Sequence, residues 1–167
     1  MKYKIVKDIY LSGKKCSIYS VFVEEYNTTL FERFVKEGLS EHKADILNIL
    51  DRIQVIAHET GARPTYFKEH EGKPGDLVSA LFDTPDKNLR LYCIRYGTML
   101  ILLGGGGPKP ESIKSWQQDE KLKEEAEWMI KVSQGLYLRQ REKEIWFINN
   151  DMDFKGDLQF GYDEEDQ

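Results

Sequence analysis

The sequence has little of the material from which metal centres, redox pairs and membrane spans are built. Its two cysteines, Cys16 and Cys93, stand far apart and without CxxC or Cys/His spacing, so we interpret both as small buried apolar residues. No apolar run approaches the roughly 20 residues that a bilayer-crossing helix needs. The first residues also lack the apolar stretch of a secretory signal. We therefore expect a cytoplasmic protein with no membrane contact, no metal ion and no cofactor.

An excess of basic charge is also missing. The formal net charge is −5, but residues 151–167 hold seven acidic side chains against the single Lys155. Residues 1–150 consequently carry about +1, so the acidity belongs to the C-terminal end. The body of the chain is not basic enough to indicate RNA binding by charge alone.

The length of 167 residues suits one domain with a sizeable core. Alternating apolar residues predict a hairpin over residues 3–23, and apolar residues at three- and four-residue steps predict helices over 29–38 and 40–61. The second helix should pack one face, which includes Ile46, Ile49 and Ile53, on a sheet. An antiparallel meander follows, then a helix after Ser112 or Ser115, and a β-prone extension over 145–162. The expected strands of the meander are Leu77–Asp83, Leu89–Tyr96 and Met99–Leu103.

The strand Leu89–Tyr96 offers the most informative pattern. Side chains alternate across a strand, so Arg90, Tyr92 and Tyr96 share one face while Leu89, Leu91 and Cys93 share the other. A face with a guanidinium and phenol rings suits RNA, because the cation pairs with phosphate and the rings stack on unpaired bases. The alternative is that Arg90 is an ordinary exposed strand residue and that the tyrosines pack beneath the C-terminal segment.

A wider set of segments resembles the RelE/HigB-like toxins, particularly their phage-derived branch. The resemblance covers about residues 15–135 of a single domain 1–167, which leaves the extension 145–162 and a short acidic tail 163–167 outside it. It implies an α+β fold in which helices pack on one face of a small antiparallel sheet. The segments that carry it follow a helical region in this order: Tyr66-Phe67-Lys68, Leu89-Arg90-Leu91-Tyr92, Met99-Leu100-Ile101-Leu102-Leu103-Gly104, Lys109 and a helix that starts near Glu111-Ser112.

The family's activity implies what these residues would do. Typical members cut mRNA on the ribosome until a cognate antitoxin, here expected to be a helix-turn-helix protein, neutralises them. The reaction needs no metal: the ribose 2′-hydroxyl attacks the neighbouring phosphate, a base accepts its proton, and cations stabilise the added charge. The implied catalytic residues are Arg90, Lys109 and His70. The implied RNA-binding residues are Lys68, Tyr92, Arg95 and Tyr96.

Two departures from the family pattern keep other functions open. The strand Leu77–Asp83 has no cation where members often carry a Glu-x-Arg-like element. After the last strand, Gly105-Gly106-Gly107-Pro108-Lys109-Pro110 stands where an aromatic residue and paired lysines are common. A catalytically inactive relative or a small protein-interaction domain therefore remains an alternative. The glycine run lacks the GxxxxGK[ST] spacing of a phosphate loop and favours a turn or a bulge. Glu124, Glu125 and Glu127 are expected on a solvated helix face.

Overall fold

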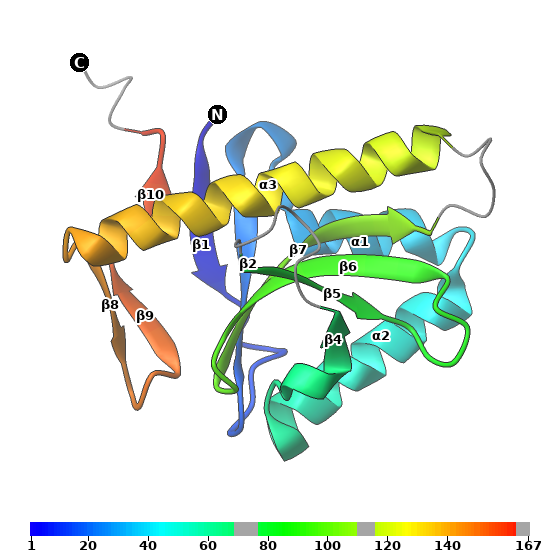
Figure 1. The fold of residues 1–167 in the computed structure, drawn as a ribbon, viewed down its shortest axis with the longest axis horizontal. Coiled ribbons are helices and arrows are strands. Elements are labelled where there is room, and N and C mark those ends of the chain that lie inside the picture. The colour runs from blue at the N-terminus through cyan, green and yellow to red at the C-terminus, as the bar shows by residue number, and fades with distance from the viewer. Residues whose placement is uncertain (69–76, 110–115, 163–167) are drawn as a thin grey trace.

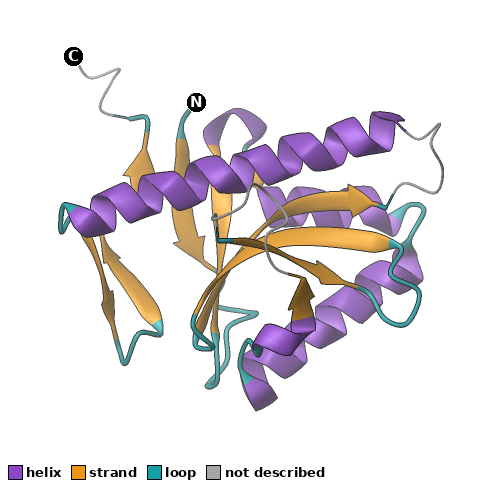
Figure 2. Ribbon diagram, viewed as in Figure 1, coloured by secondary structure: helices purple, strands orange, loops and turns teal. Residues whose placement is uncertain are grey.

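The fold is a mixed β-sheet with helices on both faces, as Figure 1 and Figure 2 show. The computed structural model describes residues 1–68, 77–109 and 116–162. Helices and strands mix along the chain, so the expected α+β class is confirmed.

The main sheet has the strand order β10-β1-β2-β7-β6-β5-β4, with β3 paired to β2. The expected N-terminal hairpin (β1–β2) and meander (β5–β6–β7) are both confirmed as antiparallel pairs. β2 and β7 run parallel, however, so the sheet is mixed rather than purely antiparallel. The strands are β1 (Tyr3–Lys7), β2 (Ser17–Val23), β3 (Thr28–Thr29), β4 (Phe67–Lys68), β5 (Val78–Phe82), β6 (Leu89–Tyr96), β7 (Leu100–Pro108) and β10 (Gln159–Phe160).

Helices α1 (Leu30–Leu39) and α2 (Lys43–Val55) cover one face of the sheet. The Thr29 hydroxyl accepts a hydrogen bond from the Glu32 N–H at 3.0 Å and so caps the start of α1. α2 continues as a π-helical turn, Ile56–Thr60, up to Gly61. The expected packing face of α2 is confirmed, because Ile46, Ile49 and Ile53 are all buried against the sheet.

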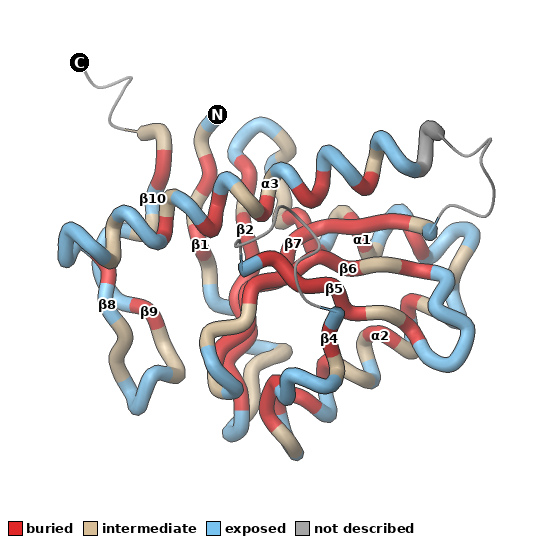
Figure 3. Tube along the Cα trace, in the orientation of Figure 1, coloured by how far each residue is buried: buried red, intermediate tan, exposed pale blue. Residues whose placement is uncertain are grey.

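Helix α3 (Trp116–Arg141) lies on the opposite face, which corrects the expectation that the helices share one face. The reason lies in β7, where Leu100 and Leu102 point to one side while Ile101 and Leu103 point to the other. A strand that is apolar on both sides needs cover on both sides, and Figure 3 shows the central strands buried. The buried residues that α3 supplies are Leu122, Ala126, Met129, Val132 and Leu136.

The glycine run continues β7 rather than ending it, which corrects the expected strand end at Leu103. The pairing register shifts between Leu91, opposite Gly106, and Cys93, opposite Leu103, so the expected bulge is present. A Cβ atom at Gly104 would overlap the Met129 side chain. The glycines therefore let α3 lie close on the strand.

The C-terminal extension forms a second, two-stranded sheet and one further strand of the main sheet. β8 (Ile145–Ile148) and β9 (Asp153–Gly156) pair antiparallel, and β10 pairs with β1. The rings of Tyr3 and Phe160 stack at 4.7 Å across that last pair. The β-prone character expected of residues 145–162 is confirmed.

Candidate nucleic-acid interface

Arg90 lies near the start of β6, on the face of the sheet that α3 also covers. Its direct neighbours in the sheet are Phe82 on β5 and Gly107 on β7. The guanidinium carbon lies 5.4 Å from the centre of the Phe82 ring, and the residue is half-buried. Gly107 adds no side chain of its own beside Arg90. The cation is thus supported by an aromatic ring and still reaches the surface.

Lys68 joins Arg90 on the same face. It is exposed on β4 and pairs with Ala80, and Ala80 pairs with Tyr92, two residues along β6 from Arg90. Directly paired residues of antiparallel strands project to the same side of a sheet. The register therefore places two of the expected cations on one face of the sheet, on β4 and β6 with β5 between them.

Lys109 lies at the same end of the sheet as Arg90. Its backbone N–H donates to the carbonyl oxygen of Asn88 at 2.8 Å, which holds it beside the start of β6, and the residue is exposed. Lys68, Arg90 and Lys109 thus come from three separate parts of the sequence to one part of the sheet. We call these three residues the cationic edge.

The two tyrosines of the expected RNA face lie in different environments. Tyr92 is 3% exposed beneath α3, and Tyr96 packs on Phe147 and Phe154 of the C-terminal hairpin. Burial raises the pKa of Tyr96 well above its usual range. Tyr92 is therefore too deeply buried to stack on a base, and the alternative packing beneath the C-terminal segment holds for Tyr96, whereas Tyr92 lies beneath α3.

Arg95 also departs from its expected place. Arg95 lies three residues after Tyr92 along β6, so it projects to the opposite face, which α1 and α2 cover. There its guanidinium carbon lies 5.6 Å from the centre of the Phe67 ring. Its Nη1 donates to the carbonyl oxygens of Ala62 and Gly97, at 3.5 and 3.1 Å. Arg95 is therefore separated from Arg90 by the thickness of the sheet. His70, the remaining candidate, lies outside the described residues.

Glu125 is 2% exposed, so the expectation of a solvated helix face is wrong for this residue. Its Oε1 lies 2.5 Å from Nη2 of Arg33 on α1 and 3.4 Å from Nζ of Lys121. Lys121 in turn lies 2.9 Å from a carboxylate oxygen of Glu37. The spacing did contain the signal, because Glu125 follows Leu122 by three residues and precedes Met129 by four, on the apolar stripe of α3.

A cavity of about 460 Å³ opens beside this ion network, between the end of α1 and the glycine end of β7. Its lining includes the acidic residues Glu37 and Glu41 and the basic residue Lys121, so both signs of charge are present. Phe34 and Leu89 form its apolar floor. The cavity adjoins the cationic edge through Gly107, the direct neighbour of Arg90.

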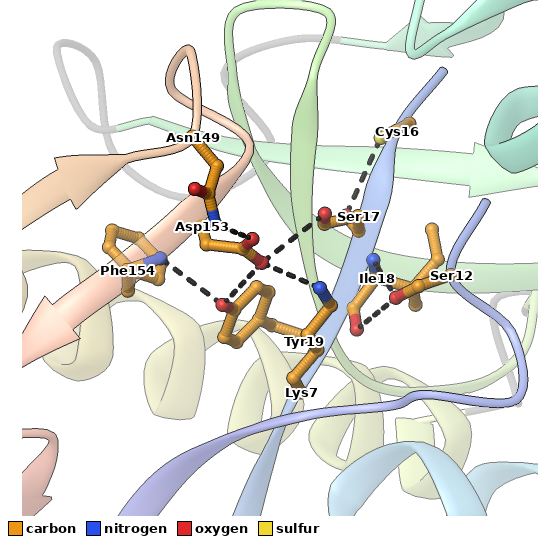
Figure 4. A network of polar contacts seen from close by, with 9 residues as sticks. All are labelled: Lys7, Ser12, Cys16, Ser17, Ile18, Tyr19, Asn149, Asp153 and Phe154. Atoms are coloured by element: carbon orange, nitrogen blue, oxygen red, sulfur yellow. Dashed lines mark hydrogen bonds and ion pairs between the residues drawn. The ribbon is translucent and has the colours of Figure 1, made fainter. Parts of the chain in front are cut away.

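A second polar cluster, shown in Figure 4, fastens the C-terminal hairpin to the N-terminal strands. Asp153 Oδ1 lies 2.8 Å from Lys7 Nζ and accepts a hydrogen bond from the Tyr19 hydroxyl at 3.0 Å, while Asn149 donates to Oδ2 at 2.8 Å. Burial opposes the charge of Asp153, but these hydrogen bonds outweigh it and lower the pKa of the carboxyl. Burial also raises the pKa of Tyr19 to about 12. The cluster has the character of a structural anchor.

Within 1–68, 77–109 and 116–162, no group of three or more His, Cys, Asp or Glu side chains could hold a metal ion. Among the helices of those ranges, none is both long and apolar enough to span a bilayer. No protein-family model, curated protein or solved structure matches the chain.

Proposed function

We propose that the chain is a RelE/HigB-like toxin that binds mRNA at the cationic edge and cleaves it by metal-free attack of a ribose 2′-hydroxyl on the neighbouring phosphate. The observation that carries the proposal is the register that groups half-buried Arg90 with Lys68 and Lys109. The core order supports it too. Strand β2, then α1 and α2 on one face, then the antiparallel β5–β6–β7 agree with what the resemblance implies.

Arg90 is the residue that we assign to the reacting phosphate. A guanidinium can donate two parallel hydrogen bonds to phosphate oxygens, and its partial burial strengthens their attraction. The same charge stabilises the extra negative charge of the transition state. Lys68 and Lys109 add attraction for flanking phosphates, which weakens as salt rises. In this proposal His70 accepts the proton of the attacking hydroxyl.

The proposal implies two kinds of partner, an RNA substrate and an antitoxin protein. The toxin acts in the cytoplasm on mRNA at the ribosome and is held inactive by a small helix-turn-helix antitoxin. A gene for such a protein beside this one, and a stable complex of the two products, are the corresponding expectations.

A second candidate function has its own support. Burial of Tyr92 under α3 and packing of Tyr96 on the hairpin leave fewer groups around Arg90 than cleavage normally employs. A catalytically inactive relative that only binds a partner protein agrees with that depletion. Cleavage and mere binding differ in whether the chain arrests growth.

The decisive experiment induces the wild-type chain, Arg90→Ala and Arg95→Ala in bacteria at matched soluble levels. Growth and bulk translation are recorded after induction. We expect arrest with the wild type, loss of arrest with Arg90→Ala, and arrest with Arg95→Ala, because Arg95 contacts the opposite face. A harmless wild type at good soluble levels overturns active toxicity and favours the inactive relative. Equal loss in both variants removes the assignment to Arg90.

A further inference from the structure

A cavity of about 480 Å³ lies between the turn that joins β6 to β7 and the C-terminal hairpin. This volume is in the range of small-molecule sites. The cavity is distinct from the cationic edge, because it lies at the other end of β6. Its lining residues are Tyr96, Gly97, Thr98, Met99, Phe147 and Asp151.

Two aromatic rings form the walls of this cavity. The rings of Tyr96 and Phe147 are inclined at 58° with their centres 5.7 Å apart. Buried Phe154 supports both from behind, stacked on Phe147 at 5.0 Å and edge-on to Tyr96 at 5.1 Å. Both aromatic residues line the cavity, and the face of an aromatic ring attracts a cation.

Asp151 supplies a negative charge at the rim, from an unusual turn. Asn149, Asn150 and Asp151 have φ values of 55°, 57° and 66°, so three successive residues adopt the left-handed conformation. Such backbone persists only where the surroundings enforce it, and it is concentrated at functional sites. Here Asn149 donates to Asp153, which Lys7 and Tyr19 hold in turn. These contacts hold in place the turn from which Asp151 projects.

The charge around the cavity favours one sign of ligand. Among its lining residues Asp151 is the charged one, and the nearby Asp153 already has Lys7 as its counter-ion. We propose that this cavity binds an organic cation, an alkylammonium or guanidinium group, against the Tyr96 and Phe147 side chains that line it, with Asp151 as counter-ion. The inference does not depend on RNA cleavage, and it gives Tyr96 a role other than base stacking.

The test uses the full-length chain and a matched pair of probes. Choline and its uncharged carbon isostere, 3,3-dimethylbutan-1-ol, are titrated separately by NMR and calorimetry at constant ionic strength. Choline should bind at least about fivefold more tightly than the isostere, because the two differ in the charge that the rings and Asp151 recognise. A Gly-Arg-Gly peptide forms a third arm. Tighter binding of the peptide than of choline identifies a side chain of a partner as the source, and the reverse identifies a free small molecule.

Three variants decide whether binding occurs in this cavity. Phe147→Leu removes one ring and Asp151→Asn removes the charge while it keeps a residue that accepts the left-handed turn, so each should weaken choline binding roughly fivefold. Trp146→Leu is the control: Trp146 is the adjacent residue of β8, is 49% exposed and projects away from the cavity. Circular dichroism verifies that each variant is folded. Equal affinity for choline and the isostere, no binding of choline, or equal weakening by Trp146→Leu and Phe147→Leu overturns the proposal.

Discussion

The two faces of the sheet are built from different chemistry. The α1–α2 face is closed by aliphatic, phenylalanine and cysteine side chains, among them Ile18, Ile53 and Ile101. The α3 face buries Tyr3, Tyr19 and Tyr92, and it also encloses the Glu125 carboxylate. The α1–α2 face is therefore held mainly by apolar contact, with hydrogen bonds from Arg52 and Arg95 to backbone carbonyls. The α3 face also encloses the ion pair of Glu125 with Arg33.

We infer from this difference that the α1–α2 face mainly stabilises the fold and that the α3 face carries the candidate sites. Apolar packing is nearly independent of pH and salt, but buried charges are stabilising only while their partners stay in place. The cationic edge, the Glu125 network and the cavity beside Tyr96 all border the α3 side. The α1–α2 side acts as a support on which the polar side is arranged.

The largest expected effect concerns β7, the strand that both faces share. A Cβ atom at Gly106 would overlap the carbonyl oxygen of Arg90 and lie 3.0 Å from Leu91 Cα. Backbone cannot move aside as a side chain does, so Gly106→Ala should lower the free energy of unfolding by about 3 kcal/mol. Urea unfolding followed by circular dichroism measures the loss.

Gly107→Ala is the matched control for that substitution. A Cβ atom there would first meet the flexible Lys121 side chain, at 3.4 Å. We expect a loss of under about 1 kcal/mol. Equal losses at Gly106 and Gly107 would contradict the assignment of the strain to the β6 backbone.

The next effect concerns the ion pair between α1 and α3. Arg33→Ala leaves the Glu125 carboxylate, whose side chain is 3% exposed, without its 2.5 Å partner. An uncompensated buried charge is costly, although the 26% exposure of Arg33 admits some water, so we expect a loss of about 2–3 kcal/mol. Chemical denaturation of the variant provides the measurement.

Lys121→Ala serves as the comparison for Arg33→Ala. Lys121 is 34% exposed and lies 3.4 Å from the same oxygen, so its removal should cost under about 1 kcal/mol. The double variant Arg33→Ala/Glu125→Gln should be more stable than Arg33→Ala, because it no longer buries a charge. If Arg33→Ala and Lys121→Ala cost the same, the α3 face does not depend on its buried charge.

The two faces also differ in how far the sequence predicts them. Local periodicity was sufficient for Ile46, Ile49 and Ile53, and for the alternation that put Leu91 and Arg90 on opposite faces. The α3 face depends on contacts distant in sequence, such as Arg33 with Glu125 and Tyr19 with Asp153. The spacing of apolar residues does not show which element covers an apolar face. The expectation that all the helices pack on one face was therefore wrong.

The candidate site shows the same division. Strand pairing places Lys68 and Arg90 on the same face of the sheet. The order of the strands along the meander was predictable from its turns. Loss of Tyr92 and Tyr96 from the site follows from the placement of α3 and the hairpin, which the sequence pattern left open. The alternation was right for Arg90, but no local pattern indicated that a helix would cover its neighbours.

The smallest effect separates the faces by pH. Hydrogen bonds lower the pKa of the Asp153 carboxyl in the folded chain below that of an unfolded aspartate, which is about 3.9. Asp153 therefore adds stability that is fully present above about pH 4 and is lost as the pH falls through the lowered folded pKa. At pH 7, Asp153→Asn should reduce the free energy of unfolding by about 1–2 kcal/mol.

Urea unfolding at pH 7 and pH 3 tests this linkage against a variant of the other face. The deficit of Asp153→Asn should shrink at pH 3, because the unfolded wild-type carboxyl is largely protonated below its pKa of about 3.9, so that folding must release that proton. Ile53→Val removes one methylene from the apolar cluster of the α1–α2 face and should cost about 1 kcal/mol at both values. If Asp153→Asn lowers the free energy of unfolding equally at pH 7 and pH 3, the hairpin is held by packing of Phe147 and Phe154 rather than by the charge of Asp153. The two faces would then differ less than their composition indicates.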